Sequence, residues 1–211
     1  MSLADELSKK LEGGKFRLLN EKMYKNKDLT EEEFTKYHTY YSNQVKKWPV
    51  DPKTVIISKI ESNLGKDCKI ADLGCGDGLI SKKFPNVKSF DKYPVSKKII
   101  KSNLTSVEAE DKEFDVAVCC LSMMMTCITK VVKETNRILK KDGQFYIAEV
   151  TSRIRSIRKF ISDFEKLGFK LKEVDTKNTH FTMLIFTKIE DVSEHSKLPT
   201  ISLNPCLYKK R

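Results

Sequence analysis

An apolar segment that runs into a loop of three alternating glycines has the clearest potential for chemistry in this sequence. The run I-A-D-L-G-C-G-D-G spans residues 70–78, so Asp72 precedes the glycines and Asp77 lies among them. Glycine allows the chain to turn tightly and lets a ligand approach the backbone. In open α/β sheets, ligands bind beyond the carboxyl ends of the strands. We therefore expect Gly74 and Gly76 to contact a bound ligand.

The acidic residues of this loop indicate which kind of ligand it binds. A dinucleotide-binding loop has the pattern G-x-G-x-x-G and holds a pyrophosphate at a helix N-terminus. Here the pattern is D-L-G-C-G-D-G, and its carboxylates would repel a phosphate but suit a ligand with an ammonium group. S-adenosylmethionine carries an amino-acid group and a sulfonium, and it has no phosphate. We expect it as the cofactor, with Asp72 orienting the loop or the ammonium group.

A second acid supports this interpretation. Asp91 follows the apolar segment 87–90, and an acid at the tip of the second strand accepts hydrogen bonds from ribose hydroxyls. The glycine pattern alone is also compatible with an ordinary tight turn. The combination of a preceding strand, Asp72 and Asp91 favours a methyltransferase.

The elements that must position these residues alternate along the chain. Residues 1–50 are polar, rich in aromatic residues and predicted to be helical, with Thr30 and Glu33 placed to form a capping box. Strands are expected at residues 68–73, 87–90, 114–121, 144–150, 169–174 and 181–187. Further helices are expected at residues 52–63, 78–84, 130–139 and 154–167, with a turn at residues 141–143.

This alternation predicts the fold class and the domain organisation. Strands that alternate with helices form a mostly parallel sheet, and two final strands without a helix between them form an antiparallel hairpin at one edge. We expect an α/β, Rossmann-like class I methyltransferase fold with a seven-stranded sheet and a small N-terminal helical cap. The predicted parts are the cap at 1–50, the S-adenosylmethionine-binding domain at 51–190 and a C-terminal tail at 191–211.

The composition indicates the class of partner. The 211 residues include 40 Lys and Arg against 29 Asp and Glu, a formal net charge of +11, which fits a polyanion such as nucleic acid. The other interpretation is a lysine-rich, solvated surface. Six cysteines without zinc-ligand spacing, no signal peptide and no membrane-spanning segment predict a soluble intracellular protein without a metal. The candidate RNA contacts are Lys46, Lys47, Trp48, Arg153, Arg155 and Arg158.

Longer segments are more specific than any of these patterns. They include F-R-L-L-N-E-K-M-Y, Y-H-T-Y-Y-S-N-Q-V-K-K-W-P, A-D-L-G-C-G-D, F-D-V-A-V-C-C-L-S-M-M, N-R-I-L-K, A-E-V-T-S-R and P-C-L-Y-K-K-R. Through them the chain resembles the ribosomal RNA processing protein 8 family, from about Phe16 to Arg211. The resemblance implies a nucleolar enzyme of ribosome biogenesis that makes N1-methyladenosine in large-subunit ribosomal RNA. It also implies cofactor contacts at His38, Gly74, Asp91, Asn103, Leu104 and Cys120.

Two positions depart from the pattern of this family. Asn103-Leu104 stands where the family usually has Asp-Met, so a charge beside the adenine of the cofactor is lost. The run Met124-Met125-Thr126 replaces a pattern that usually has a glycine before the threonine, which changes the expected shape of the pocket for the target base.

The chemistry implied by the resemblance needs no general base. Adenine N1 already has a free lone pair, so we assign no catalytic residue and expect alignment to accelerate the transfer. N1 lies on the Watson–Crick edge, so the target base must be unpaired or flipped out. We expect the protein to be a monomer. Two alternatives to this function remain: a protein or small-molecule methyltransferase, and a non-catalytic factor in ribosome assembly or chromatin silencing.

Overall fold

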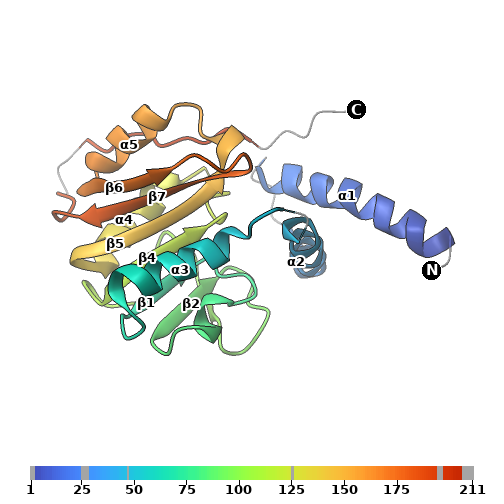
Figure 1. The fold of residues 1–211 in the computed structure, drawn as a ribbon, viewed down its shortest axis with the longest axis horizontal. Coiled ribbons are helices and arrows are strands. Elements are labelled where there is room, and N and C mark those ends of the chain that lie inside the picture. The colour runs from blue at the N-terminus through green and yellow to red at the C-terminus, as the bar shows by residue number, and fades with distance from the viewer. Residues whose placement is uncertain (1–2, 25–28, 47, 125, 194–196, 206–211) are drawn as a thin grey trace.

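A seven-stranded sheet forms the centre of the computed structural model, which describes residues 3–24, 29–46, 48–124, 126–193 and 197–205 (Figure 1). The strand order is β3-β2-β1-β4-β5-β7-β6. Strands β1 to β5 are parallel, and β7 is antiparallel to both β5 and β6. The predicted Rossmann-like fold with an antiparallel edge is therefore confirmed. The strands are β1 (Ile70–Leu73), β2 (Val87–Asp91), β3 (Ile100–Lys101), β4 (Phe114–Cys120), β5 (Leu139–Val150), β6 (Phe169–Asp175) and β7 (Phe181–Lys188).

Helices cover both faces of the sheet. They are α3 (Pro52–Leu64), α4 (Ile128–Ile138) and α5 (Ile157–Glu165). Helix α3 buries Ile56 and Ile60 against one face, while α4 and α5 bury Val132 and Phe164 against the other. The central strands β1 and β4 are buried along almost their whole length because helices cover both faces of the sheet.

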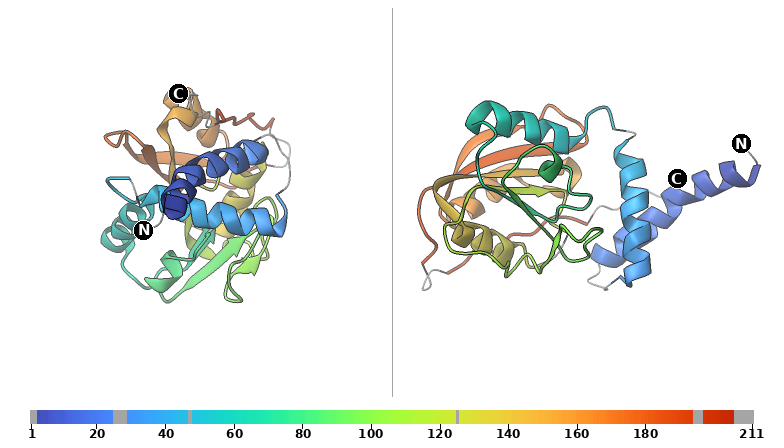
Figure 2. Two further views of the ribbon diagram at one scale, coloured as in Figure 1. Left: turned by 90° about the vertical axis from the view of Figure 1, so that its right-hand side faces the viewer. Right: turned by 90° about the horizontal axis from the view of Figure 1, so that it is seen from below.

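Two N-terminal helices, α1 (Leu3–Tyr24) and α2 (Glu31–Val45), lie beside one end of the sheet, and α1 extends away from it (Figures 1 and 2). The predicted capping box begins α2: Thr30 Oγ1 accepts a hydrogen bond from the Glu33 N–H at 3.2 Å, and Glu33 Oε2 accepts one from the Thr30 N–H at 2.9 Å. Stacking of Phe16 on Tyr37, with ring centroids 5.5 Å apart, holds α1 against α2.

The structure differs from the predicted elements in three places. The helix expected at 78–84 is only a 3-10 turn, Ile80–Lys82, because Pro85 disfavours helix in the residue before it and β2 begins two residues later. Strand β5 begins at Leu139, before the turn predicted at residues 141–143. The turn residues therefore lie inside the strand as an irregular stretch, in which Asp142 has a φ of 64°. The two-residue strand β3 was not predicted, since so short a segment has no visible periodicity.

The described part of the C-terminal tail packs against the sheet domain. Ile201 is buried in the main core, and its N–H donates to Thr129 Oγ1 at 3.0 Å. The Asn204 N–H donates to the Arg153 carbonyl oxygen at 2.8 Å. Residues 206–211 lie outside the described residues, as do Lys47 and Met125.

Candidate functional site

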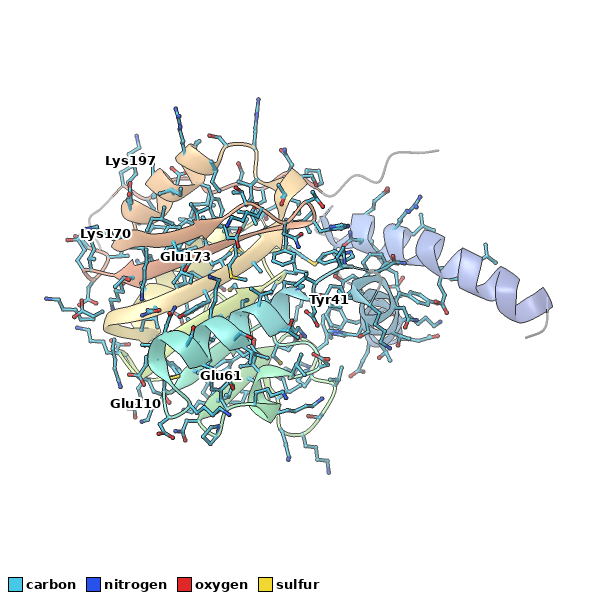
Figure 3. The ribbon with its side chains drawn as sticks, in the orientation of Figure 1. Tyr41, Glu61, Glu110, Lys170, Glu173 and Lys197 are labelled. Atoms are coloured by element: carbon cyan, nitrogen blue, oxygen red, sulfur yellow. The ribbon has the colours of Figure 1, made fainter. Side chains whose placement is uncertain are left out.

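A cavity of about 350 Å³ lies where β1, β2 and β4 end, between the sheet and α2. Tyr41 lies between α2 and the sheet (Figure 3) and lines this cavity. Seven of the residues predicted to bind the cofactor line it as well: His38, Gly74, Gly76, Asp91, Asn103, Leu104 and Cys120. The structure therefore brings together side chains from the cap and from three strand ends. Asp72 is buried in β1 and is not among the lining residues.

The glycine loop has a backbone path that other residues adopt only with strain. Gly74 and Gly76 have φ angles of 76° and 61°. A Cβ atom on Gly74 would lie 2.4 Å from the Ser122 Cβ, while one on Gly76 would lie 3.6 Å from the His38 ring. The Gly74 N–H donates to the Phe90 carbonyl oxygen at 2.8 Å, which ties the loop to β2. Glycine at position 74 is thus required both for backbone conformation and for space.

Asp91 joins the glycine loop to the loop after β2. Its Oδ2 accepts a hydrogen bond from the Gly76 N–H at 2.9 Å, and its Oδ1 accepts one from the Tyr93 N–H at 3.0 Å. The side chain is buried at the cavity wall. Each carboxylate oxygen has a second lone pair, so Asp91 can still accept hydrogen bonds from a ribose.

His38 reaches the cavity from α2. Its Nε2 is buried and has no hydrogen-bond partner within the described part of the chain. The ring of Phe34 packs on it edge-on, with centroids 4.6 Å apart. Burial lowers the pKa of His38, although the charge of Asp91 opposes this, so the imidazole is neutral at neutral pH. A buried nitrogen without a partner is the feature expected where a polar ligand completes the site.

Lys53 is a site residue that the sequence did not reveal. From the first turn of α3 it pairs with Asp77 and donates to the Cys75 carbonyl oxygen at 3.3 Å. Burial disfavours its charged form, but the hydrogen bond and charge of Asp77 outweigh this and raise its pKa. The positive charge of Lys53 therefore balances the negative charge of the Asp77 carboxylate. The sequence argument counted Asp77 as a charge that attracts a cationic ligand, and this ion pair weakens that attraction. Lys53 precedes Asp77 by more than twenty residues, so no local sequence pattern could predict that the two side chains pair.

Asn103 is arranged differently from the expectation. Its Oδ1 accepts hydrogen bonds from the N–H and the hydroxyl of Thr105, each at 3.1 Å. Both lone pairs of this oxygen are therefore used. Accepting a hydrogen bond from an adenine amino group, as the sequence suggested, requires this side chain to rotate.

The two thiols at the end of β4 are packing groups. Cys119 and Cys120 are buried, with 1% and 6% of their surface exposed. Burial raises the pKa of Cys119 to about 12, and burial also raises the pKa of Cys120. Both remain neutral at physiological pH, and a neutral thiol is a poor nucleophile.

Asp72 makes the stability of the protein depend on pH. Burial raises its pKa from 3.8 to about 7, and the charge of Lys53 opposes this shift. Between these values the folded protein keeps a proton that the unfolded chain has released, so the free energy of unfolding falls as pH rises from about 4 to 7. We expect Asp72→Asn to be more stable than wild type by about 4 kcal/mol at pH 8 and equally stable at pH 4. Urea denaturation at both pH values measures this.

The matched control for this prediction is Asp67→Asn, since Asp67 is exposed. This surface substitution should change the stability little at either pH. An Asp72→Asn variant that is less stable than wild type at pH 8 would show that the buried carboxylate is charged and required.

The candidate RNA-binding residues are divided between surface and interior. Lys46, Arg155 and Arg158 are exposed, and Trp48 is half-buried with its ring 5.5 Å from that of His180. Arg153 is only 2% exposed, and its Nη1 lies 2.7 Å from Glu149 Oε2. This burial contradicts the prediction of a phosphate contact at Arg153, because a guanidinium paired inside the protein does not reach a nucleic-acid backbone.

Among the described residues, no group of three or more His, Cys, Asp or Glu side chains is arranged to hold a metal ion. In the same part of the chain, no helix is long and apolar enough to cross a membrane.

Comparisons with known proteins agree with this site. A family model described as "Hypothetical methyltransferase" matches residues 2–211. The chain is 37% identical to "Ribosomal RNA-processing protein 8" of Drosophila melanogaster, covering 100% of this chain and 61% of that protein. It is 34% identical to "25S rRNA (adenine(645)-N(1))-methyltransferase" of Schizosaccharomyces pombe, covering 100% of this chain and 73% of that protein. The chain spans only 48–61% of the length of several such relatives.

A solved structure supports the fold. The 1,6-didemethyltoxoflavin-N1-methyltransferase of Burkholderia thailandensis has a TM-score of 0.61 to this chain at 12% identity, with 76% of this chain and 87% of that chain covered. That crystal structure contains bound S-adenosylhomocysteine. At this identity the likeness shows the fold, while the sequence relatives confirm the family resemblance that the longer segments indicated.

Proposed function

Because the chain belongs to the ribosomal RNA-processing protein 8 family, we propose that it is an S-adenosylmethionine-dependent methyltransferase that modifies N1 of an adenine in large-subunit ribosomal RNA. The observation that carries the proposal is the cavity at the strand ends. It combines the glycine loop, the buried acid Asp91 and a buried histidine nitrogen that has no hydrogen-bond partner among the described residues. These groups fit a cofactor with a ribose and no phosphate.

The cofactor, when bound, supplies a methyl group on a sulfonium. The backbone of Gly74 and Gly76 lets it approach the sheet, and Asp91 accepts hydrogen bonds from its ribose. His38 covers it from the cap, while Leu104 and Cys120 give the cavity apolar walls. In this proposal Asp72 orients the glycine loop, and Asn103 flanks the adenine of the cofactor.

The protein groups contribute alignment and exclusion of water. Proximity and orientation supply about 7–11 kcal/mol of a barrier when two reactants are held correctly. Tyr41 and Leu121 line the cavity where the cap meets the end of β4 and restrict access of water. No residue has to remove a proton before N1 attacks, since its lone pair is free.

The charge of the chain supports an RNA substrate. A net charge of +11, with Lys46, Arg155 and Arg158 exposed, fits contacts to phosphates, and such binding weakens as salt rises. The target base must be unpaired or flipped, because N1 is hidden in a duplex. We place this activity in ribosome biogenesis, in the nucleus and nucleolus, with pre-ribosomal RNA as the partner.

The test is methylation of ribosomal RNA by the purified chain. Unmodified large-subunit ribosomal RNA is incubated with S-adenosylmethionine carrying an isotope-labelled methyl group and then digested to nucleosides. We expect labelled N1-methyladenosine, resolved by chromatography and mass spectrometry from N6-methyladenosine. Small-subunit ribosomal RNA serves as the matched control and should remain unlabelled.

Two results would overturn the proposal. Binding of S-adenosylhomocysteine without any methylated RNA would favour the non-catalytic assembly factor, for which the engaged amide oxygen of Asn103 is a supporting observation. Label on protein or on small molecules instead of RNA would favour the other class of methyltransferase.

A further inference from the structure

A second cavity, of about 300 Å³, adjoins the first. Tyr37, Tyr41, Leu121 and Met124 line both cavities, so the two spaces share a wall at the point where α2 meets the end of β4. None of the residues predicted to bind the cofactor lines the second cavity. It is therefore a separate space directly beside the proposed cofactor site.

Aromatic rings form part of the wall of the second cavity. Tyr41 comes from α2 and lies between that helix and the sheet (Figure 3). Trp48 follows α2, and His180 precedes β7; their rings are 5.5 Å apart. Trp48 also stacks on Phe181 with centroids 6.3 Å apart, which fixes the orientation of the indole. Flipped bases are held between such aromatic and apolar side chains.

Glu149, at the carboxyl end of β5, gives this cavity a fixed hydrogen-bond acceptor. It is 1% exposed, and its Oε1 accepts from the Val150 N–H at 2.7 Å. Its Oε2 is 2.7 Å from Arg153 Nη1, yet in the described part of the chain it has no partner with hydrogen-bond alignment. Burial raises the pKa of Glu149, and the charge of Arg153 opposes this. Buried polar atoms normally have a partner, so Oε2 is a position where a ligand can donate.

Arg153 holds this carboxylate in place. Its Nη2 donates to the Met123 carbonyl oxygen at 2.9 Å, and its Nε donates to the Asn204 carbonyl oxygen at 3.0 Å. The guanidinium therefore connects the loop after β4, the end of β5 and the C-terminal segment. The first two segments contribute lining residues to the second cavity, and the C-terminal segment contacts the lining residue Arg153.

We propose that the second cavity receives the target adenine and that Glu149 accepts a hydrogen bond from the exocyclic amino group of that base. The inference rests on the proposed function, since it assumes an adenine substrate. The amino group lies next to N1 on the same edge of the base, so recognition by Glu149 turns N1 towards the shared wall and the cofactor cavity. Glu149 is thereby a specificity-determining residue, and Tyr41 and Trp48 provide stacking surfaces.

The charge change of the reaction favours a carboxylate at this position. The N1 lone pair forms the new N–C bond, the C–S bond breaks, and its electron pair stays on sulfur. The sulfonium becomes a neutral thioether, and the adenine ring gains one positive charge, which is shared with the amino group. A carboxylate that accepts from this amino group is therefore bound more strongly in the transition state than in the ground state.

The test compares two short single-stranded RNA probes in the presence of saturating S-adenosylhomocysteine. Both are uridine oligonucleotides, one with a central adenosine and the other with a central purine riboside, which lacks the amino group. Fluorescence anisotropy gives their affinities for the wild-type chain. We expect the adenosine probe to bind about tenfold more tightly, the effect of one hydrogen bond to a charged acceptor.

A double variant tests the assignment to Glu149. Glu149→Met with Arg153→Met removes the acceptor and its counter-charge together, because replacement of a buried ion pair by apolar residues is often tolerated. We expect this variant to bind S-adenosylhomocysteine as wild type does and to lose the tenfold preference. The matched control is Lys59→Met with Glu173→Met, an ion pair that lines neither cavity. It should keep the preference.

The outcomes separate this inference from the proposed function. Equal binding of both probes by the wild type would overturn the role of Glu149 while leaving an RNA substrate in place, and this comparison needs no variant to fold. A double variant that folds and keeps the preference would do the same. Failure of both probes and of ribosomal RNA to bind, with S-adenosylhomocysteine still bound, would overturn the proposed function as well.

Discussion

Asp91→Ala is expected to weaken S-adenosylhomocysteine binding about 100-fold while the protein stays folded. The carboxylate anchors the Gly76 N–H and the Tyr93 N–H, so its removal releases two of the loops that shape the cavity. It also removes the proposed acceptor for the ribose. Loss of about two hydrogen bonds to a charged group corresponds to about 3 kcal/mol of binding free energy. Titration calorimetry measures the affinity, and a thermal melt checks the fold.

The matched control for this prediction is Asp175→Ala. Asp175 also ends a strand and accepts a hydrogen bond from the N–H two residues later, that of Lys177 at 2.9 Å, but it lies outside the cavity. It should bind S-adenosylhomocysteine with the wild-type affinity. Wild-type affinity in Asp91→Ala as well would place the cofactor elsewhere and remove the basis of the proposed function.

Gly74→Ala is expected to destabilise the fold by about 3 kcal/mol and to abolish cofactor binding. Two effects add: a φ of 76°, which disfavours any side chain, and a Cβ only 2.4 Å from the Ser122 Cβ. Ser122 also holds the end of β1, since its Oγ donates to the Leu73 carbonyl oxygen at 2.7 Å. The clash therefore has to displace a loop that the cofactor cavity needs. Urea denaturation and calorimetry measure the two effects.

Gly65→Ala separates the two causes. Gly65 has nearly the same φ, 75°, but a Cβ there has no atom within 4 Å. It should lose only about 2 kcal/mol, the cost of placing a non-glycine residue at a φ of 75° and a ψ of −167°. The double variant Gly74→Ala with Ser122→Gly should recover part of the stability that Gly74→Ala loses. Equal destabilisation by Gly65→Ala and Gly74→Ala would show that the close approach to Ser122 does not contribute to the loss of unfolding free energy.

The features that the sequence predicted correctly depend on neighbouring residues. The strand before the glycine loop, the capping box of α2 and the antiparallel pair β6 and β7 are each set by local periodicity or by side chains within one turn. Asp91 could be placed at the cavity because parallel strands all end at the same edge of a sheet. The alternation of strands and helices was therefore enough for the fold, the glycine loop and Asp91, whereas His38, Asn103, Leu104 and Cys120 were predicted from the family resemblance.

The features that the sequence did not reveal depend on how the elements pack against one another. Lys53 pairs with Asp77 across 24 positions because α3 packs beside the glycine loop. Arg153 pairs with Glu149 only four residues away, but the burial of this pair depends on the elements that pack over the end of β5. The burial of Arg153 reversed its expected role for the same reason. A charged residue in a polar segment is exposed or buried according to the elements that close over it.

The site itself shows the same division. Local residue types were sufficient to predict a glycine loop and an acid for a nucleoside cofactor, because backbone conformation and strand direction are short-range properties. The placement of α2 over the strand ends, the buried nitrogen of His38 and the second cavity with Glu149 come from packing of the cap against the sheet. That packing buries apolar surface contributed by distant segments, so it is a property of the assembled chain and of no single segment.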